Sequence, residues 1–146
     1  MMFLLRNIDF MENNMKLLPP KLIMHYKEQK SAVEKSFPFI HCRISSKGLI
    51  CDGIFTLPKS STEYEIQLKY EVSKRPKVYV LNPEIEYNQD IHMYKDSSLC
   101  LFYPPDNSWK KNSQLFDTII PWTVEWLVNY EIFKLSGKWV GPYKSH

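Results

Sequence analysis

The stretch EYEIQLKYEV, residues 63–72, alternates strictly between two kinds of side chain. Apolar and aromatic residues occupy every second position, namely Tyr64, Ile66, Leu68, Tyr70 and Val72, and Glu, Gln and Lys fill the positions between them. Successive side chains of a strand point to opposite faces, so this pattern predicts a strand in a sheet with one dry and one wet face. The rest of the chain must then supply neighbouring strands and a cover for the dry face.

Three further strands are predicted around this one. FIHCRISS alternates in the same way, with Ile40, Cys42 and Ile44 on one face, and GLICDGIFTL follows after a short turn. KVYVL supplies a fourth short strand, which is entered through Pro76 and followed by another proline. Together these segments predict an antiparallel meander.

A helix is predicted on each side of the meander. The first runs from Pro19 to Lys35, because a proline pair suits a first helical turn and good helix formers follow. The second is capped by Asp117 or Thr118 and stops at Gly137. It carries an aromatic and apolar stripe that we interpret as core packing: Ile119, Trp122, Trp126, Tyr130 and Phe133.

The order of these elements predicts an α+β domain whose sheet is covered on one face. Between the last strand and the second helix, residues 82–112 show no period, and a stretch of this length without regular structure is usually functional. The chain has 146 residues, enough for one domain. We place that domain at residues 15–146 and treat residues 1–14 as a poorly defined segment.

Charge and hydropathy exclude several classes of function. The net charge of +3 comes from 19 basic and 16 acidic residues without a basic run, which argues against nucleic-acid binding. The amino end, MMFLLRNIDFMENN, lacks the pattern of a signal peptide, and no later stretch is long enough to span a membrane. We therefore expect a cytoplasmic protein.

The three cysteines make an odd count without a C-x-x-C pair. This argues against a disulfide framework or a structural zinc site, and it fits a reducing compartment. Cys42 and Cys51 lie in predicted strands, where we expect them to be small packing residues.

Cys100 lies instead in the irregular segment, and its residues alone leave three interpretations open. It could pack between Leu99 and Leu101, or it could be a nucleophile paired with His92 or His146. It could also join His92 and Asp96 as a metal ligand, although no fourth ligand is evident.

A series of motifs around Cys100 resembles the ubiquitin-conjugating enzyme family. RPKVYV matches the family's proline-rich strand entry, His92 its histidine, SSLCL its cysteine motif and Trp109 its tryptophan, and a long helix follows in the same order. The resemblance implies the ubiquitin-conjugating fold from about Leu18 onward. It also implies that Cys100 receives the carboxy terminus of a ubiquitin-like protein as a thioester and passes it to an amine.

The sequence departs from the family after His92. The family carries proline and asparagine there, whereas this chain has Met93 and Tyr94. Tyr94 takes the register of the asparagine and could donate its hydroxyl to the oxyanion, and Asn107 or Asn112 are the alternatives. We count His92 with Cys100 and Tyr94 as the catalytic group, but expect a structural hydrogen-bonding role for it.

Contact with the substrate is assigned to three further residues of the irregular segment: Leu101, Asn107 and Trp109. No metal or cofactor is expected. The chain has no G-x-G-x-x-G or P-loop motif with which to adenylate a carboxylate. Either a separate activating enzyme supplies the acyl group, or the system is a minimal one that works without it.

The carboxy-terminal half is similar to a narrower group. LCLFYPPDNSW, IIPWTVEWLVNYE and SGKWVGPYKSH resemble stand-alone conjugating proteins of cyclic-oligonucleotide-based antiphage signalling (CBASS) operons. The implied partner is the carboxy-terminal tail of a cGAS-like nucleotidyltransferase, or a ubiquitin-like protein. The alternative function is a catalytically silent module that binds the nucleotidyltransferase, and a cysteine hydrolase is a more distant one.

Overall fold

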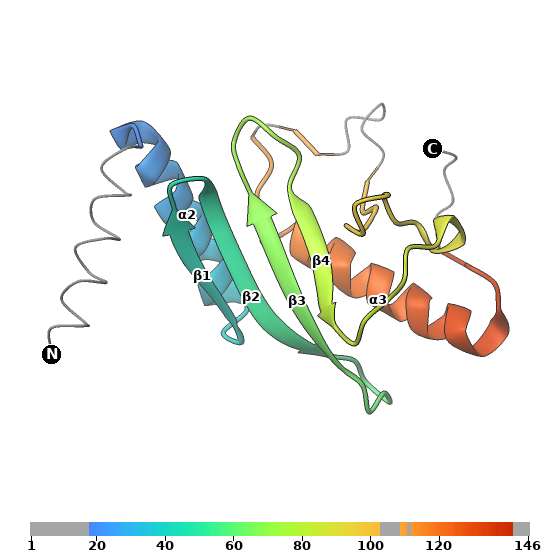
Figure 1. Ribbon diagram of the computed structural model, residues 1–146. Coiled ribbons are helices and arrows are strands. Elements are labelled where there is room, and N and C mark those ends of the chain that lie inside the picture. Colours follow the sequence, from blue (N-terminus) through green and yellow to red (C-terminus); the bar gives the residue numbers. More distant parts are fainter. Residues whose placement is uncertain (1–17, 103–108, 111, 142–146) are drawn as a thin grey trace, which may run out of the picture.

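The computed structural model describes residues 18–102, 109–110 and 112–141. Two long helices enclose a sheet in sequence order, and a short 3₁₀ helix precedes the second of them. The elements are α2 (Pro20–Ser36), β1 (Ile40–Ser45), β2 (Gly48–Thr56), β3 (Glu63–Tyr70), β4 (Lys77–Asn82), η1 (Gln89–Ile91) and α3 (Ile119–Ser136). The strands lie in the order β1-β2-β3-β4, and each neighbouring pair is antiparallel (Figure 1). The predicted α+β layout is confirmed; the predicted segment 1–14 lies outside the described residues.

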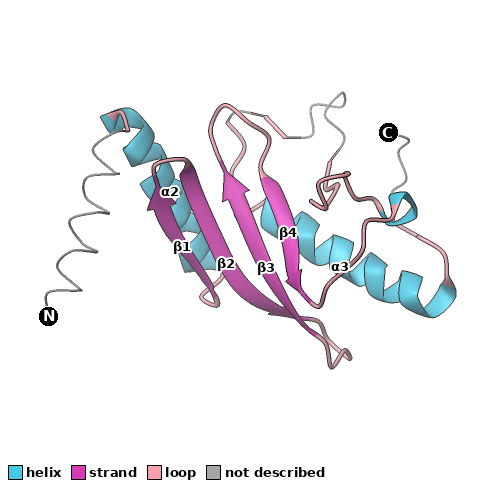
Figure 2. Ribbon diagram, in the orientation of Figure 1, coloured by secondary structure: helices cyan, strands magenta, loops and turns pink. Residues whose placement is uncertain are grey.

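Both helices cover the same face of the sheet (Figure 2). The ring of Tyr26 in α2 lies 5.8 Å from that of Tyr70, and the ring of Tyr130 in α3 lies 6.4 Å from that of Tyr64. Tyr64 and Tyr70 belong to the buried side of β3, while Glu63, Glu65 and Lys69 are exposed on its other side. The strict alternation of β3 therefore places the core, as predicted.

Helix α2 contacts the rest of the molecule through a polar residue that the sequence pattern does not single out. Gln29 is buried, and its side-chain oxygen accepts a hydrogen bond from the Leu115 backbone N–H at 3.1 Å. Its side-chain nitrogen donates to the Gln114 side chain at 2.9 Å. A buried amide must satisfy its hydrogen bonds, so Gln29 fixes the segment before α3 against α2.

Helix α3 ends as predicted at Gly137, which adopts the left-handed conformation with φ 73°. At the other end Thr118 occupies the N-cap position, but its side chain makes no capping bond to the helix. Its hydroxyl donates instead to the Gln114 carbonyl and accepts from the Trp109 indole N–H at 3.1 Å. The predicted capping bond from the Thr118 side chain is therefore wrong, because the hydroxyl bonds to Trp109 and Gln114 instead.

Cys42 and Cys51 lie directly opposite each other in the β1–β2 register and are joined by a disulfide. Both are buried, so the expected packing role holds. The expectation that they remain unpaired is wrong. Strand register brings the two sulfur atoms together, and register is not visible in cysteine spacing.

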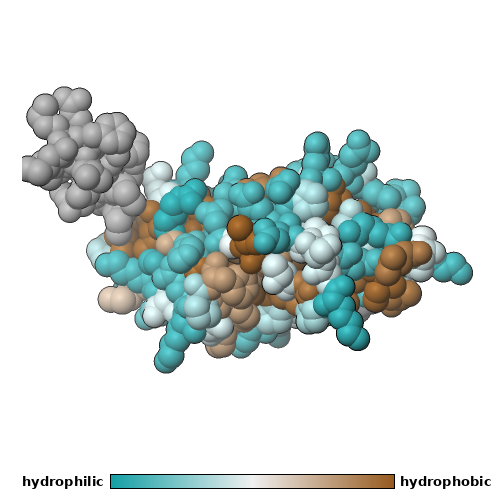
Figure 3. Space-filling model, turned by 90° about the horizontal axis from the view of Figure 1, so that it is seen from below, coloured by the Kyte–Doolittle hydropathy of each residue, from teal (hydrophilic) through white to brown (hydrophobic). Residues whose placement is uncertain are grey.

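The surface combines polar side chains with separate apolar ones. Figure 3, which views the molecule from below, shows hydrophilic side chains interspersed with isolated hydrophobic patches. The most exposed large apolar side chains come from different elements and include Leu135, Met24 and Ile54. Within the described residues, no helix is both long enough and apolar enough to cross a membrane.

Two glycines with positive φ give a matched test of this fold. A Cβ at Gly48, with φ 131°, would overlap the Tyr70 carbonyl oxygen, whereas a Cβ at Gly137 would meet no atom within 4 Å. We expect Gly137→Ala to lower the free energy of unfolding by about 1 kcal/mol, and Gly48→Ala by roughly 3 kcal/mol or more. Denaturant unfolding of both variants measures this difference, and equal losses would contradict the close β2–β3 packing at Gly48.

Candidate active site

Cys100 lies at the end of a tight hairpin within the long irregular segment. Met93 and Leu99 form an antiparallel bridge, and the Tyr94 backbone N–H donates to the Ser98 carbonyl at 2.9 Å. One step further along, the Cys100 N–H donates to the His92 carbonyl, also at 2.9 Å. These bonds place the two arms of the hairpin side by side and bring Tyr94 near Cys100.

The hairpin is anchored on both sides. The Leu99 N–H donates to the Val78 carbonyl of β4 at 2.8 Å. From α3, the buried Trp126 donates its indole N–H to the carbonyls of Ile91 and His92, at 3.0 Å each. A segment without regular structure thus acquires a fixed position between the edge strand and α3.

The turn of the hairpin is held by Asp96. Its carboxylate accepts hydrogen bonds from the backbone N–H and hydroxyl of the buried Ser98, and it pairs with Lys77 of β4 at 2.8 Å. Burial alone would raise the pKa of Asp96, but the hydrogen bonds from Lys77 and Ser98 outweigh it and hold that pKa well below its ordinary value. Asp96 is therefore a structural carboxylate of the turn.

The surroundings of the Cys100 thiol are partly buried and contain two hydrogen-bonding groups. The Tyr94 hydroxyl is within hydrogen-bonding reach of the sulfur and, at 3.3 Å, of the Phe102 carbonyl oxygen, and its single proton can be donated to either acceptor. The sulfur lies 3.7 Å from the same carbonyl. Burial raises the pKa of the Cys100 thiol, while the Tyr94 hydrogen bond and the Arg75 charge act to lower it. The net direction is upward, so at neutral pH the thiol is mainly protonated.

Arg75, from the turn between β3 and β4, completes this group. Its guanidinium carbon lies 3.7 Å from the centroid of the Tyr94 ring, which is a close cation–π contact. Burial first, and then the Cys100 thiol, raise the pKa of Tyr94 to about 12. Tyr94 therefore keeps its proton at neutral pH and remains a hydrogen-bond donor.

His92 is placed by backbone and ring contacts. Its side chain is buried, its backbone is left-handed with φ 55°, and its ring lies 5.3 Å from the Trp139 ring. Its carbonyl accepts bonds from Cys100 and Trp126. These contacts are the kind expected of a residue that supports the hairpin.

The three residues assigned to substrate contact have different settings. Leu101 is half-buried and packs against the core, next to Cys100. Trp109 is also half-buried, and its ring contacts Tyr70 edge-on at 5.6 Å while its N–H engages Thr118. Asn107 lies outside the described residues. Trp109 therefore holds the start of α3 to the sheet.

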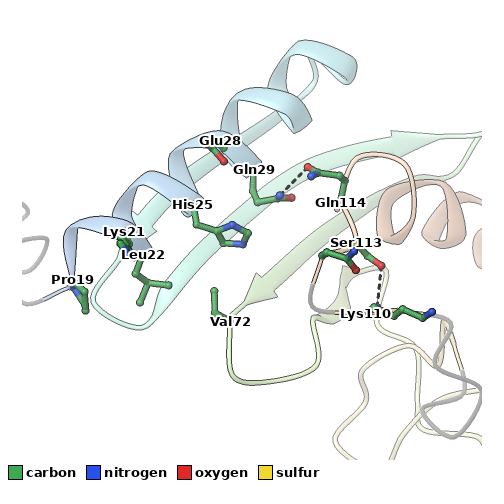
Figure 4. A pocket seen from close by; sticks show the side chains of 11 residues that line it. Pro19, Lys21, Leu22, His25, Glu28, Gln29, Val72, Lys110, Ser113 and Gln114 are labelled. Atoms are coloured by element: carbon green, nitrogen blue, oxygen red, sulfur yellow. Dashed lines mark hydrogen bonds between the residues drawn. The ribbon is translucent and has the colours of Figure 1, made fainter.

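The other interpretations of Cys100 find little geometric support. His146, the second candidate for a dyad, lies outside the described residues. Among the residues that are described, no three His, Cys, Asp or Glu side chains gather so as to hold a metal ion. Asn112, an alternative oxyanion donor, lines a groove of about 800 Å³ between α2 and residues 110 and 112–114 (Figure 4). Neither Cys100 nor Tyr94 lines that groove.

Sequence reasoning missed two members of the site. Arg75 stands in the RPKVYV motif, but only the fold brings it to Tyr94. The Phe102 carbonyl is a backbone group and leaves no signal in the sequence. The site therefore consists of the partly accessible Cys100 thiol, the neutral Tyr94 phenol as a hydrogen-bond donor, and the Arg75 cation beside them. This arrangement suits a cysteine nucleophile whose attack creates an oxyanion.

A family model described as Type II CBASS E2 protein matches residues 29–146. The matched range takes in the second half of α2, the whole sheet, the Cys100 hairpin and α3. No curated protein matches the chain.

The pH dependence of Cys100 alkylation tests how burial and hydrogen bonding together shift the pKa of its thiol. Because burial raises its pKa, we expect alkylation by iodoacetamide to reach half its maximal rate above the ordinary thiol value of about 8.5. Tyr94→Phe removes a hydrogen bond that lowers the pKa, so it should move the midpoint further up. Mass spectrometry of the alkylated peptide gives the rates, with exposed Tyr87→Phe as the control. A midpoint that stays unchanged in Tyr94→Phe would contradict the assigned contact.

Proposed function

The chain belongs to the family of type II CBASS E2 proteins, and on that premise we propose that Cys100 carries a protein acyl group as a thioester and transfers it to an amine. The observation that carries the proposal is the pairing of a half-buried Cys100 thiol with the Tyr94 hydroxyl on an anchored hairpin. An E2-like role in CBASS also directs the search for a partner to the CBASS system itself.

The first step is an exchange between thiols. The Cys100 thiol loses its proton, its sulfur attacks the carbonyl carbon of an activated acyl thioester, and the carbonyl oxygen becomes an oxyanion. The Tyr94 hydroxyl donates a hydrogen bond to that oxyanion. The oxyanion collapses, the original thiolate leaves and takes up a proton, and the acyl group is now bound to Cys100.

The second step is aminolysis. An amine nitrogen attacks the Cys100 thioester, the carbon–sulfur bond breaks, and an amide and the free thiol result. The Arg75 charge beside Tyr94 favours negative charge at the sulfur and at the oxyanion in both steps. Its ring contact also holds the phenol in one orientation.

The acyl group comes from a protein carboxy terminus. We propose the tail of the cGAS-like nucleotidyltransferase of the same system, with a ubiquitin-like protein as the alternative donor. Conjugation would then regulate the synthesis of the nucleotide signal. The acyl group must arrive activated, because the chain lacks a nucleotide-binding motif with which to adenylate a carboxylate.

One observation favours a second candidate function, a binding module without chemistry. Burial raises the pKa of Cys100, and the family's asparagine is replaced by Tyr94. A thiol that is mostly protonated at neutral pH is a slow nucleophile. Such a protein would bind the nucleotidyltransferase and hold it in place without transferring its tail.

Adduct formation separates the two functions. When the protein is incubated with the nucleotidyltransferase and the other proteins of its operon, we expect an adduct on non-reducing gels that disappears with thiol. Cys100→Ala should abolish it, and Cys100→Ser should give an ester that resists thiol but yields to alkali. If wild-type protein forms no adduct while Cys100→Ala still protects cells against phage, the binding module is correct and transfer is wrong.

The role of Tyr94 has its own test. Tyr94→Phe keeps a ring under Arg75 but removes the hydroxyl. We expect it to slow discharge of a preformed Cys100 thioester to an amine by roughly tenfold or more, because one oxyanion donor is lost. Single-turnover gels measure the rate, with Tyr87→Phe as the matched control on an exposed tyrosine. Discharge at the wild-type rate would remove Tyr94 from the mechanism.

A further inference from the structure

A basic groove lies beside the candidate active site, at the end of the sheet where the β1–β2 turn meets the β3–β4 turn. Its volume is about 260 Å³. Among the residues that line it, Glu71 is the one acidic residue. Five lining residues are basic: Lys47, Lys69, Lys74, Arg75 and Lys77. Because the whole chain carries a net charge of only +3, this groove is a concentration of positive charge.

Much of this positive charge is not offset within the described part of the chain. Glu71 pairs with Lys74 at 3.3 Å, and Asp96 pairs with Lys77. No carboxylate of the described residues lies within ion-pair distance of Lys47, Lys69 or Arg75. The groove therefore presents at least three cations to an incoming molecule.

The strand register adds a cost that an anion would relieve. Lys69 of β3 lies directly opposite Lys77 of β4. Like charges at opposed positions of an antiparallel pair disfavour the sheet. Asp96 already offsets the charge of Lys77, so an anionic group in the groove would act mainly on the charge of Lys69.

The groove is also continuous with the Cys100 hairpin. Arg75 lines the groove and contacts the Tyr94 ring at 3.7 Å. Lys77 lines it as well and is paired with Asp96 in the turn of the hairpin. A chain segment that occupied the groove would therefore lie next to the group that surrounds the thiol.

We propose that this groove binds an acidic peptide segment of the protein that Cys100 receives. Its charge selects an anion, and its place beside the hairpin suits a segment near the reacting carboxy terminus. A polypeptide fits better than a single-stranded nucleic acid, because the lining Tyr70 is buried and its ring is not available for base stacking. The identity of the ligand rests on the proposed transfer, but binding does not require chemistry at Cys100.

Complementary charge acts mainly on the encounter. Attraction between the groove and acidic side chains accelerates association and suppresses partners of the wrong sign. The interaction is screened within a Debye length of about 8 Å at physiological salt. The groove would thus select the correct protein and direct its tail towards the thiol.

The test measures binding with Cys100→Ala protein, so that its failure and a failure of thioester transfer are distinguishable. The probe is a fluorescein-labelled oligo-glutamate peptide, with an oligo-glutamine peptide of equal length for comparison, and fluorescence anisotropy gives the affinity at low salt. Lys47→Glu and Lys69→Glu should each weaken binding roughly threefold to tenfold. Lys27→Glu makes the same charge change at an exposed position of α2 and should leave the affinity within about twofold.

The outcomes divide clearly. Tighter binding of oligo-glutamate than of oligo-glutamine, weakened in both groove variants but not in Lys27→Glu, supports the proposal. Equal binding of the two peptides, or equal loss in Lys27→Glu, overturns it. A single-stranded oligonucleotide that displaces oligo-glutamate at lower charge concentration would assign the groove to nucleic acid instead. Lys47→Glu and Lys69→Glu are also made in protein that keeps Cys100, where unchanged Cys100 alkylation rates exclude a general loss of structure.

Discussion

The indole N–H of Trp126 holds the candidate site in place. It donates from a buried position on α3 to the carbonyls of Ile91 and His92, and the Cys100 N–H donates to the His92 carbonyl from the other arm of the hairpin. The backbone bonds within the hairpin join its two arms to each other, so its position relative to the sheet and α3 depends on bonds from its neighbours. Through Trp126 the packing of α3 on the sheet fixes where the thiol lies.

In this site, burial and nearby charge have opposite effects on the ionisation of Cys100. Burial disfavours the Cys100 thiolate, whereas the Tyr94 hydroxyl and the Arg75 guanidinium favour it. The same two groups would favour an oxyanion on a bound acyl group, so they act on both negatively charged species of a transfer reaction. A thiol that is mostly protonated at rest is less readily oxidised, because the thiolate is the form that oxidants attack.

The fold was predictable because its signals are local. The alternation in β3 predicts the buried face, and proline and glycine mark the helix ends. The predicted stripe of α3 coincides only in part with its buried side: Ile119 and Trp126 are buried, whereas Trp122, Tyr130 and Phe133 are half-buried. Ile120, Thr123 and Leu127 are buried without belonging to the stripe. Interactions across the sheet were not predictable in this way. The disulfide between Cys42 and Cys51, the buried Gln29 amide and the use of Thr118 by Trp109 depend on register and on contacts between distant segments.

The sequence by itself determined the element order, the dry face of the sheet and the choice of Cys100 as the candidate nucleophile, because each rests on periodicity or on the order of motifs along the chain. Tertiary structure alone decided that Arg75 covers Tyr94, that Tyr94 reaches the thiol, and that five basic residues from two turns and the adjoining ends of β3 and β4 form one groove. The reason is physical: side-chain contacts between segments that are distant in the sequence follow from strand pairing and helix packing. Neither can be derived from the spacing of residues along a short stretch of the chain.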